Sequence, residues 1–117
     1  MPSYAEDHAA IEDLLARYAH GCDARDLAAI GDCFTLDAQA EYSGVRLARG
    51  LTHILAHLAG LSALAASQHV IGSVSVTVDG DRATARSYAV AHLVRAVDGG
   101  HEVIHRGLRY DARLGRT

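Results

Sequence analysis

Two histidines one helical turn apart are the first residues whose spacing suggests chemistry. His53 and His57 stand four residues apart in a helical pattern, so both imidazoles would lie on one face of a helix, as in metal-binding helices. No HExxH motif accompanies them, and no third ligand is evident in the sequence. Because a catalytic zinc takes three protein ligands, we expect neither a metal site nor another cofactor.

Side chains of the types used in acid–base chemistry include Asp23, His69 and Tyr18, although their spacing by itself does not single them out. A neutral imidazole such as that of His69 is a competent base near neutral pH when a partner fixes its tautomer. Each candidate also has a purely structural explanation. Asp23 stands where it would cap a second helix, His69 enters a predicted strand, and Tyr18 lies on the apolar stripe of the first helix. The residues alone leave both interpretations open.

The elements that must position these side chains follow from the periodicity of apolar residues. Spacings of three and four predict three helices, over residues 7–22, 24–34 and 51–66. Alternation and turn residues predict strands over residues 37–44, 45–48, 70–78, 82–97 and 101–113. Asp79-Gly80 is a strong hairpin signal between two of these strands. Helices followed by a run of strands indicate an α+β domain, in which a curved, mostly antiparallel sheet wraps over the helices and leaves a pocket at its wide end.

Composition excludes several classes of protein. The 117 residues are expected to form a single domain, 1–117, and half of them are hydrophobic, which is enough for a sizeable core. The net charge of −3 provides no basic surface for nucleic acid. No apolar run approaches the roughly 18–20 residues of a membrane span, and the start of the chain is too acidic for a signal peptide. Cys22 and Cys33 form no CxxC pair, so inert buried thiols and a cytoplasmic location are expected.

Several short motifs, in order along the chain, resemble the SnoaL-like branch of the nuclear transport factor 2-like superfamily. They are AIEDLLARY at 10–18, CDARD at 22–26, FTLDA at 34–38, Gly44 with Gly50, Gln68-His69, and VDGDRA at 78–83. Within the superfamily the chain is most similar to the group that contains scytalone dehydratase and hexachlorocyclohexane dehydrochlorinase. The resemblance implies a cone-shaped α+β fold and a pocket for a small hydrophobic molecule.

The same resemblance implies an Asp–His dyad, which in that group joins an Asp after the first helix to a His at the strand after the third. The matching positions are Asp23 and His69. His69 would then remove a proton from carbon while a hydroxyl or halide leaves, which is the reaction of a lyase or a related isomerase. Tyr18 would donate a hydrogen bond to a carbonyl or leaving group. The predicted substrate-binding residues are Tyr42, Tyr88, His92 and His105, although the strand pattern does not show which sheet face the two histidines occupy.

The chain departs from the family pattern at two places. Ser73 stands where the family often has Asn. The sequence reaches Thr117 where the family adds a final strand, so either the domain lacks that strand or the sheet is completed in another way. Other functions therefore stay open. One is ligand binding without turnover, and another is a structural role like that of the β subunits of ring-hydroxylating dioxygenases. A third, epoxide hydrolysis, would need an Asp–Arg–Asp arrangement that the sequence does not reveal.

The late strands also predict self-association. Apolar residues occupy both alternations of the strand over 82–97, for example Ala89 with Leu93 and Val90 with Val94. If one face of the sheet covers the helices, the other would present apolar side chains to a partner. A homodimer or a higher homo-oligomer is therefore expected.

Overall fold

The computed structural model describes residues 2–116, in which helices come first and a sheet follows. The helices are α1 (Tyr4–Ala24), α2 (Leu27–Gly31) and α3 (Leu51–Leu58), and a 3-10 turn continues α3 over Ala59–Ala63. The strands are β1 (Glu41–Tyr42), β2 (Val45–Arg46), β3 (Ala66–Asp79), β4 (Arg82–Val97) and β5 (Gly100–Gly115). The predicted α+β class is thus confirmed. Among the described residues, no helix has the length and apolar character to cross a membrane.

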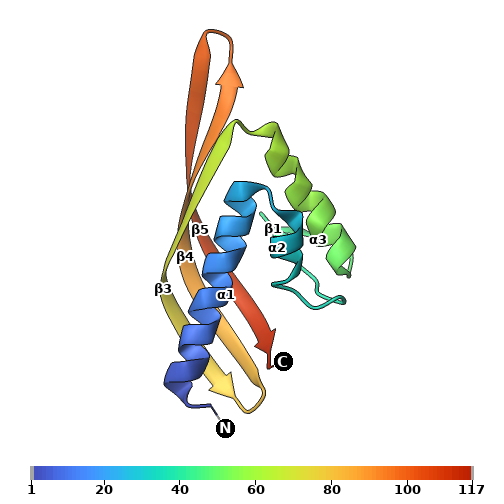
Figure 1. Ribbon diagram of the computed structural model, residues 1–117, viewed down its shortest axis with the longest axis vertical. Coiled ribbons are helices and arrows are strands. Elements are labelled where there is room, and N and C mark those ends of the chain that lie inside the picture. Colours follow the sequence, from blue (N-terminus) through green and yellow to red (C-terminus); the bar gives the residue numbers. More distant parts are fainter. Residues whose placement is uncertain (1, 117) are drawn as a thin grey trace.

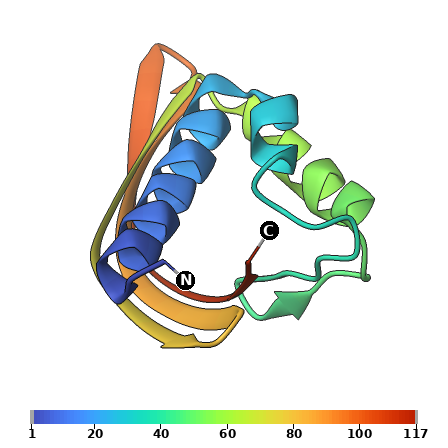
Figure 2. The ribbon, with the colours of Figure 1, turned by 60° about the horizontal axis from the view of Figure 1, so that its bottom comes forward.

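The sheet is an antiparallel meander in the order β3-β4-β5, and β1 pairs with β2 in a separate small hairpin. Figure 1 shows α1 lying along one face of the sheet, with α2, α3 and the small hairpin beyond it. Seen from the end in Figure 2, the sheet curves beneath α1 and the remaining helices close the other side. This arrangement is the predicted cone.

Several predicted boundaries are corrected by local hydrogen bonds. α1 begins earlier than predicted because Ser3 caps it in a capping box with Glu6. α2 begins at Leu27, later than predicted, because Asp26 caps it through a side chain that accepts a hydrogen bond from the Ala29 N–H, and it ends at Gly31. The predicted third helix stops at Leu58, and β3 begins at Ala66, inside the range expected to be helical.

Two apolar clusters hold the helices in place. Near the first half of α1, Ile11 packs with Val76 of β3 and Ala85 of β4. Near its end, Cys22 joins a cluster with Ile30, Ile54 and Leu58 from α2 and α3. The inward positions of β4 from 83 to 91 carry small side chains, namely Ala83, Ala85, Ser87, Ala89 and Ala91. Small side chains let the helix axis approach the sheet closely.

A β-bulge in β3 decides which side chains face the helices. The register with β4 shifts between Gly72 and Ser75, and Ser73 adopts a left-handed φ of 53° there. Before the bulge the odd-numbered positions, such as His69, face inward. After it the even-numbered positions, such as Val76, do so. His69 and Val76 therefore share one face of the sheet although they are seven positions apart, an offset that in a regular strand places two side chains on opposite faces.

The end of β5 is tied to the start of α1. The Arg116 guanidinium donates to both carboxylate oxygens of Asp7, at 2.7 and 3.1 Å, and to the Gly80 carbonyl at 3.0 Å. These hydrogen bonds lower the pKa of the Asp7 carboxyl from its usual value. The ion pair thus joins α1, the turn between β3 and β4, and the last part of the described chain.

This ion pair makes a pH-dependent prediction. Because the pKa of Asp7 is lowered in the folded state, its stabilising effect is present at neutral pH and is lost as the pH falls below about 4. Arg116→Gln is expected to lower the thermal midpoint by up to a few degrees at neutral pH. The difference in thermal midpoint between Arg116→Gln and wild type should disappear in acid. Arg113→Gln, near the end of β5, is the control. A difference in thermal midpoint between Arg116→Gln and wild type that stays constant with pH would contradict the assignment.

Gly21 generates a second prediction. A Cβ atom at this position would lie 3.0 Å from Cγ1 of Ile30, a side chain that is only 1% exposed. Gly21→Ala stabilises the helix by about 1 kcal/mol because alanine has the higher helix propensity. The added methyl group also overpacks the core against Ile30, which costs about 1–3 kcal/mol. We therefore expect a net loss of about 1 kcal/mol in the free energy of unfolding, measured with urea. Gly60→Ala, where a Cβ meets nothing within 4 Å, should lose nothing; equal effects at both sites would refute the packing argument.

Candidate active site

Asp23 belongs to the last turn of α1, which corrects the expectation that it caps the second helix. Asp26 performs that role instead, as described above. The carboxylate of Asp23 is thus free of a capping function. It reaches the first residues of β3, the strand that carries His69.

Three hydrogen bonds converge on the Asp23 carboxylate. The Nδ1–H of His69 donates to Oδ1 at 2.7 Å, and the backbone N–H of His69 donates to Oδ2 at 2.8 Å. The Ser67 hydroxyl donates to Oδ1 at 2.9 Å. The side chains of His69 and Asp23 are 12% and 22% exposed. With its Nδ1 proton directed at a carboxylate, the neutral imidazole keeps its lone pair on Nε2, where a base needs it.

Tyr18 belongs to a group of three tyrosines, of which Tyr110 is close enough to Asp23 to be affected by its charge. The Tyr18 hydroxyl is 2.9 Å from that of Tyr42, and the Tyr18 ring meets the ring of Tyr110 edge to face at a centroid distance of 6.3 Å. Burial raises the pKa of all three phenols. For Tyr110 the pKa rises to about 12, with further contributions from Cys22, Tyr42 and Asp23. The phenols therefore stay protonated at neutral pH and can donate hydrogen bonds.

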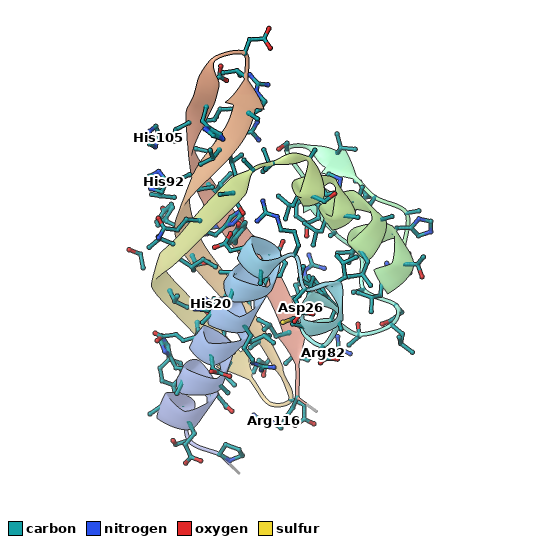
Figure 3. All side chains as sticks on the ribbon, turned by 45° about the horizontal axis from the view of Figure 1, so that its top comes forward. His20, Asp26, Arg82, His92, His105 and Arg116 are labelled. Carbon is teal, nitrogen blue, oxygen red and sulfur yellow. The ribbon has the colours of Figure 1, made fainter. Side chains whose placement is uncertain are left out.

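The structure does not bring Tyr88, His92 and His105 to this site. On β4 the inward positions are odd-numbered, and Tyr88 and His92 occupy even-numbered ones. His105 pairs with His92 across the two strands, with 2.7 Å between their Nδ1 atoms. Figure 3 shows both histidines projecting from the sheet on the side away from the helices. Tyr42 is the one predicted substrate-binding residue that lies with Tyr18.

No group of three or more His, Cys, Asp or Glu side chains within residues 2–116 is arranged to hold a metal. Of the pair His53 and His57 on α3, His57 stacks on the ring of Tyr42, with ring centroids 4.6 Å apart. His57 thus lies beside a member of the tyrosine group.

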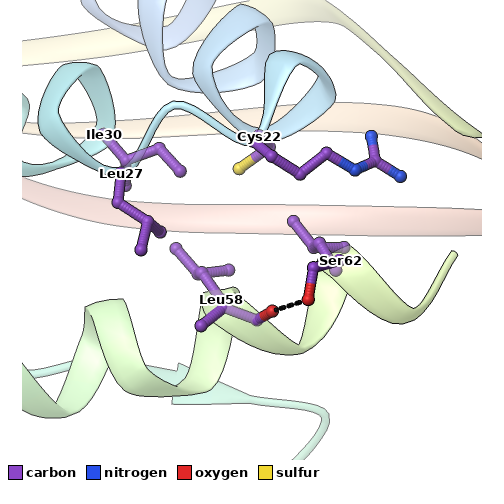
Figure 4. Close-up of a pocket in the computed structure, with 8 residues that line it drawn as sticks. Cys22, Leu27, Ile30, Leu58 and Ser62 are labelled. Carbon is purple, nitrogen blue, oxygen red and sulfur yellow. Dashed lines mark hydrogen bonds between the residues drawn. The ribbon is translucent and has the colours of Figure 1, made fainter.

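A small apolar cavity lies beside the dyad, between the end of α1 and the helices α2 and α3. Its volume is about 160 Å³ and its lining includes Cys22, Arg25, Ile30, Leu58 and Ser62 (Figure 4). Burial raises the pKa of the Cys22 thiol to about 11, which keeps it protonated and a poor nucleophile. Asp23 and His69 do not line this cavity, so a cavity that both of them line stays a prediction.

Sequence reasoning missed three residues at this site. Ser67 stands two positions before His69 on the same strand face, and Arg25 follows Asp23 by two residues. Tyr110 comes from β5, more than forty residues from His69 in sequence. The CDARD motif contains Arg25 and hinted at it. The sequence pattern of β5 does not show which of its residues face the helices, so it could not place Tyr110 at the site.

Comparison with known proteins supports the fold. The SnoaL-like domain model matches residues 3–117, whereas no curated protein matches the chain. Rv3472 of Mycobacterium tuberculosis, described as a protein of unknown function, is 28% identical with a TM-score of 0.77 over 92% of this chain. The present chain spans 65% of that protein, just under two thirds of its length.

Two further structures have the same fold at lower identity. A nuclear transport factor 2-like superfamily protein from Salmonella enterica is 18% identical, with a TM-score of 0.82 over 97% of this chain and 82% of its own. A Novosphingobium aromaticivorans protein, named as a proposed scytalone dehydratase, is 18% identical with a TM-score of 0.68. That match covers 94% of this chain and 91% of its own. At these identities the likeness concerns the fold.

Proposed function

This chain belongs to the SnoaL-like domain family, and we propose that it is a cofactor-independent lyase that acts on a small hydrophobic molecule. The observation that carries the proposal is the 2.7 Å hydrogen bond between Asp23 and Nδ1 of His69. It directs the lone pair on Nε2 away from the carboxylate. A carboxylate in this position also stabilises the imidazolium that forms when the base takes a proton.

In the proposed reaction, His69 Nε2 takes a proton from a carbon next to a carbonyl group. The electron pair of that C–H bond forms a carbon–carbon double bond as a hydroxyl or halide leaves the neighbouring carbon. A leaving hydroxyl takes up the proton from the imidazolium and departs as water, which restores neutral His69. A halide leaves as the anion, and the imidazolium then loses its proton to solvent.

Tyr18 and Tyr42 support this chemistry as hydrogen-bond donors. Their hydroxyls are 2.9 Å apart, so one donates to the other and the second keeps its proton for a ligand. Because the pKa of each phenol is raised by burial, both are neutral donors at physiological pH. A donor aimed at a carbonyl oxygen stabilises the negative charge that develops there.

Ligand binding without turnover is the second candidate, and one observation favours it. The cavity of Figure 4 is walled by apolar side chains from α2 and α3 and carries one guanidinium, that of Arg25. Such a site would take a small apolar molecule with a polar or anionic end. It lies next to the dyad without including it.

We further propose that the chain self-associates through the outer face of the sheet. Val70, Tyr88 and Val90 are 54%, 56% and 46% exposed there. Val70 pairs directly with Val90, so the apolar side chains lie on adjacent strands. Covering such a surface with a second copy removes it from water.

The lyase proposal predicts that the carboxylate of Asp23 is essential. Asp23→Asn keeps the side-chain volume but removes the charge that orients and stabilises the imidazole. His69→Gln removes the base. Each is expected to lower kcat about 100-fold or more for elimination from β-hydroxy or β-chloro aryl ketones, followed by the absorbance of the enone product.

Asp26→Asn is the matched control for this experiment. It makes the same chemical change three residues away, and Asn caps a helix about as well as Asp, so activity and stability should both be retained. If wild type and Asp23→Asn have equal activity, the dyad is not catalytic. If wild type converts none of these ketones but binds them, the second candidate replaces the first.

The association proposal predicts a mass of twice the 12.4 kDa chain by light scattering at micromolar concentration. Val90→Asp places a charge in the proposed interface and should give the mass of one chain. Val45→Asp, at an exposed position of β2, is the control and should not change the mass. A wild-type mass of one chain across the micromolar range would refute the proposal.

A further inference from the structure

Arg25 holds a backbone conformation that its residue type disfavours. It follows the last turn of α1 with a φ of 54° and a ψ of 37°, in the left-handed region where helices usually end in glycine. A residue with a Cβ is strained in this region. Glycine would avoid this strain. We therefore look to the hydrogen bonds of the Arg25 side chain for the reason that an arginine occupies the position.

Those contacts tie the end of α1 to the start of β3. The Nη1 group donates to the backbone carbonyl of Asp23 at 2.8 Å and to the Ser67 hydroxyl oxygen at 3.1 Å. The Nη2 group donates to the Leu64 carbonyl at 3.4 Å. The guanidinium therefore fills the corner between helix and strand, directly behind the carboxylate that meets His69.

The hydrogen bond from Arg25 gives the Ser67 hydroxyl a direction. A serine hydroxyl has one proton to donate, together with lone pairs that accept. With Arg25 donating to its oxygen, the Ser67 proton points to Oδ1 of Asp23 at 2.9 Å. The same oxygen accepts the Nδ1–H of His69. Arg25 thus donates to Ser67, and Ser67 donates to Asp23. The Asp23 carboxylate in turn accepts the Nδ1–H of His69.

The geometry of β3 supports the same role. Ser67 and His69 are two residues apart, on one face of the strand, and both donate to the same carboxylate. The backbone N–H of His69 takes the second oxygen, Oδ2. A carboxylate held by donors on both oxygens cannot rotate without breaking hydrogen bonds.

We propose that Arg25 and Ser67 are positioning residues that fix the Asp23 carboxylate for the Nδ1–H of His69. Neither touches the reacting atoms. The consequence for catalysis rests on the proposed lyase function, whereas the effect on the imidazole proton does not. Arg25 also lines the small cavity, so the same guanidinium connects that cavity to the dyad.

The test is an NMR measurement of the His69 Nδ1 proton in the full chain, assigned by its loss in His69→Gln. In wild type the proton should resonate far downfield and exchange slowly with water. Ser67→Ala and Arg25→Gly should speed that exchange by about tenfold or more, as expected when a hydrogen bond to a charged group is lost. Ser67→Thr keeps the hydroxyl and should preserve slow exchange. Arg25→Gly also relieves the left-handed strain, so the variant is expected to fold.

Two controls separate positioning from general destabilisation. Ser62→Ala, in the lining of the small cavity, removes a hydroxyl that donates to the Ala59 carbonyl and not to Asp23. Ser73→Gly relieves a left-handed residue at the bulge without touching Asp23. Both should leave the exchange rate unchanged.

The outcomes distinguish this inference from the proposed function. Unchanged exchange in Ser67→Ala and Arg25→Gly overturns the positioning role, even if Asp23→Asn abolishes turnover. Faster exchange in both variants supports it, even if the wild type turns over no ketone. In an active enzyme the same two variants should lower kcat more than they change KM.

Discussion

A single carboxylate joins the end of the longest helix to the beginning of the sheet. Asp23 closes α1, and its three hydrogen bonds all come from Ser67 and His69 at the start of β3. A partly buried charge is costly unless donors surround it. The positions of α1 and β3 relative to each other are therefore coupled to the chemistry of one side chain. Arg25, which bonds to both segments, strengthens the same junction.

The rest of the cone accommodates this junction. α1 packs mainly against β3, and its Ile11 also meets Ala85, one of the small side chains on the inner face of β4. Gly21, one turn before the helix ends, allows Ile30 of α2 to pack against the helix backbone. The bulge at Gly72–Ser75 then lets His69 and the core valines of β3 face the same side. Apolar packing thus fixes α1 on the sheet near its start, and the hydrogen bonds of Asp23 fix it near its end.

The two faces of the sheet have different chemistry. The inner face carries His69 and Tyr110 close to Asp23 and Tyr18, where burial raises the pKa of the phenols. The outer face carries exposed apolar residues and the pair His92 and His105. A fold of this kind does not fix a function. The proposed lyase chemistry therefore rests on the hydrogen bonds of the inner face and not on the family fold.

The sequence by itself determined the order of elements, the turn at Asp79-Gly80 and the limits of β4, because apolar period and turn chemistry are local properties. Its resemblance to a known family also paired Asp23 with His69. Only the tertiary structure decided that His92 and His105 face outward, and that Tyr110, Ser67 and Arg25 join the site. The physical reason is that strand phase and register are not local. One extra residue in a bulge reverses the face of every later side chain, and long-range packing determines where that residue lies.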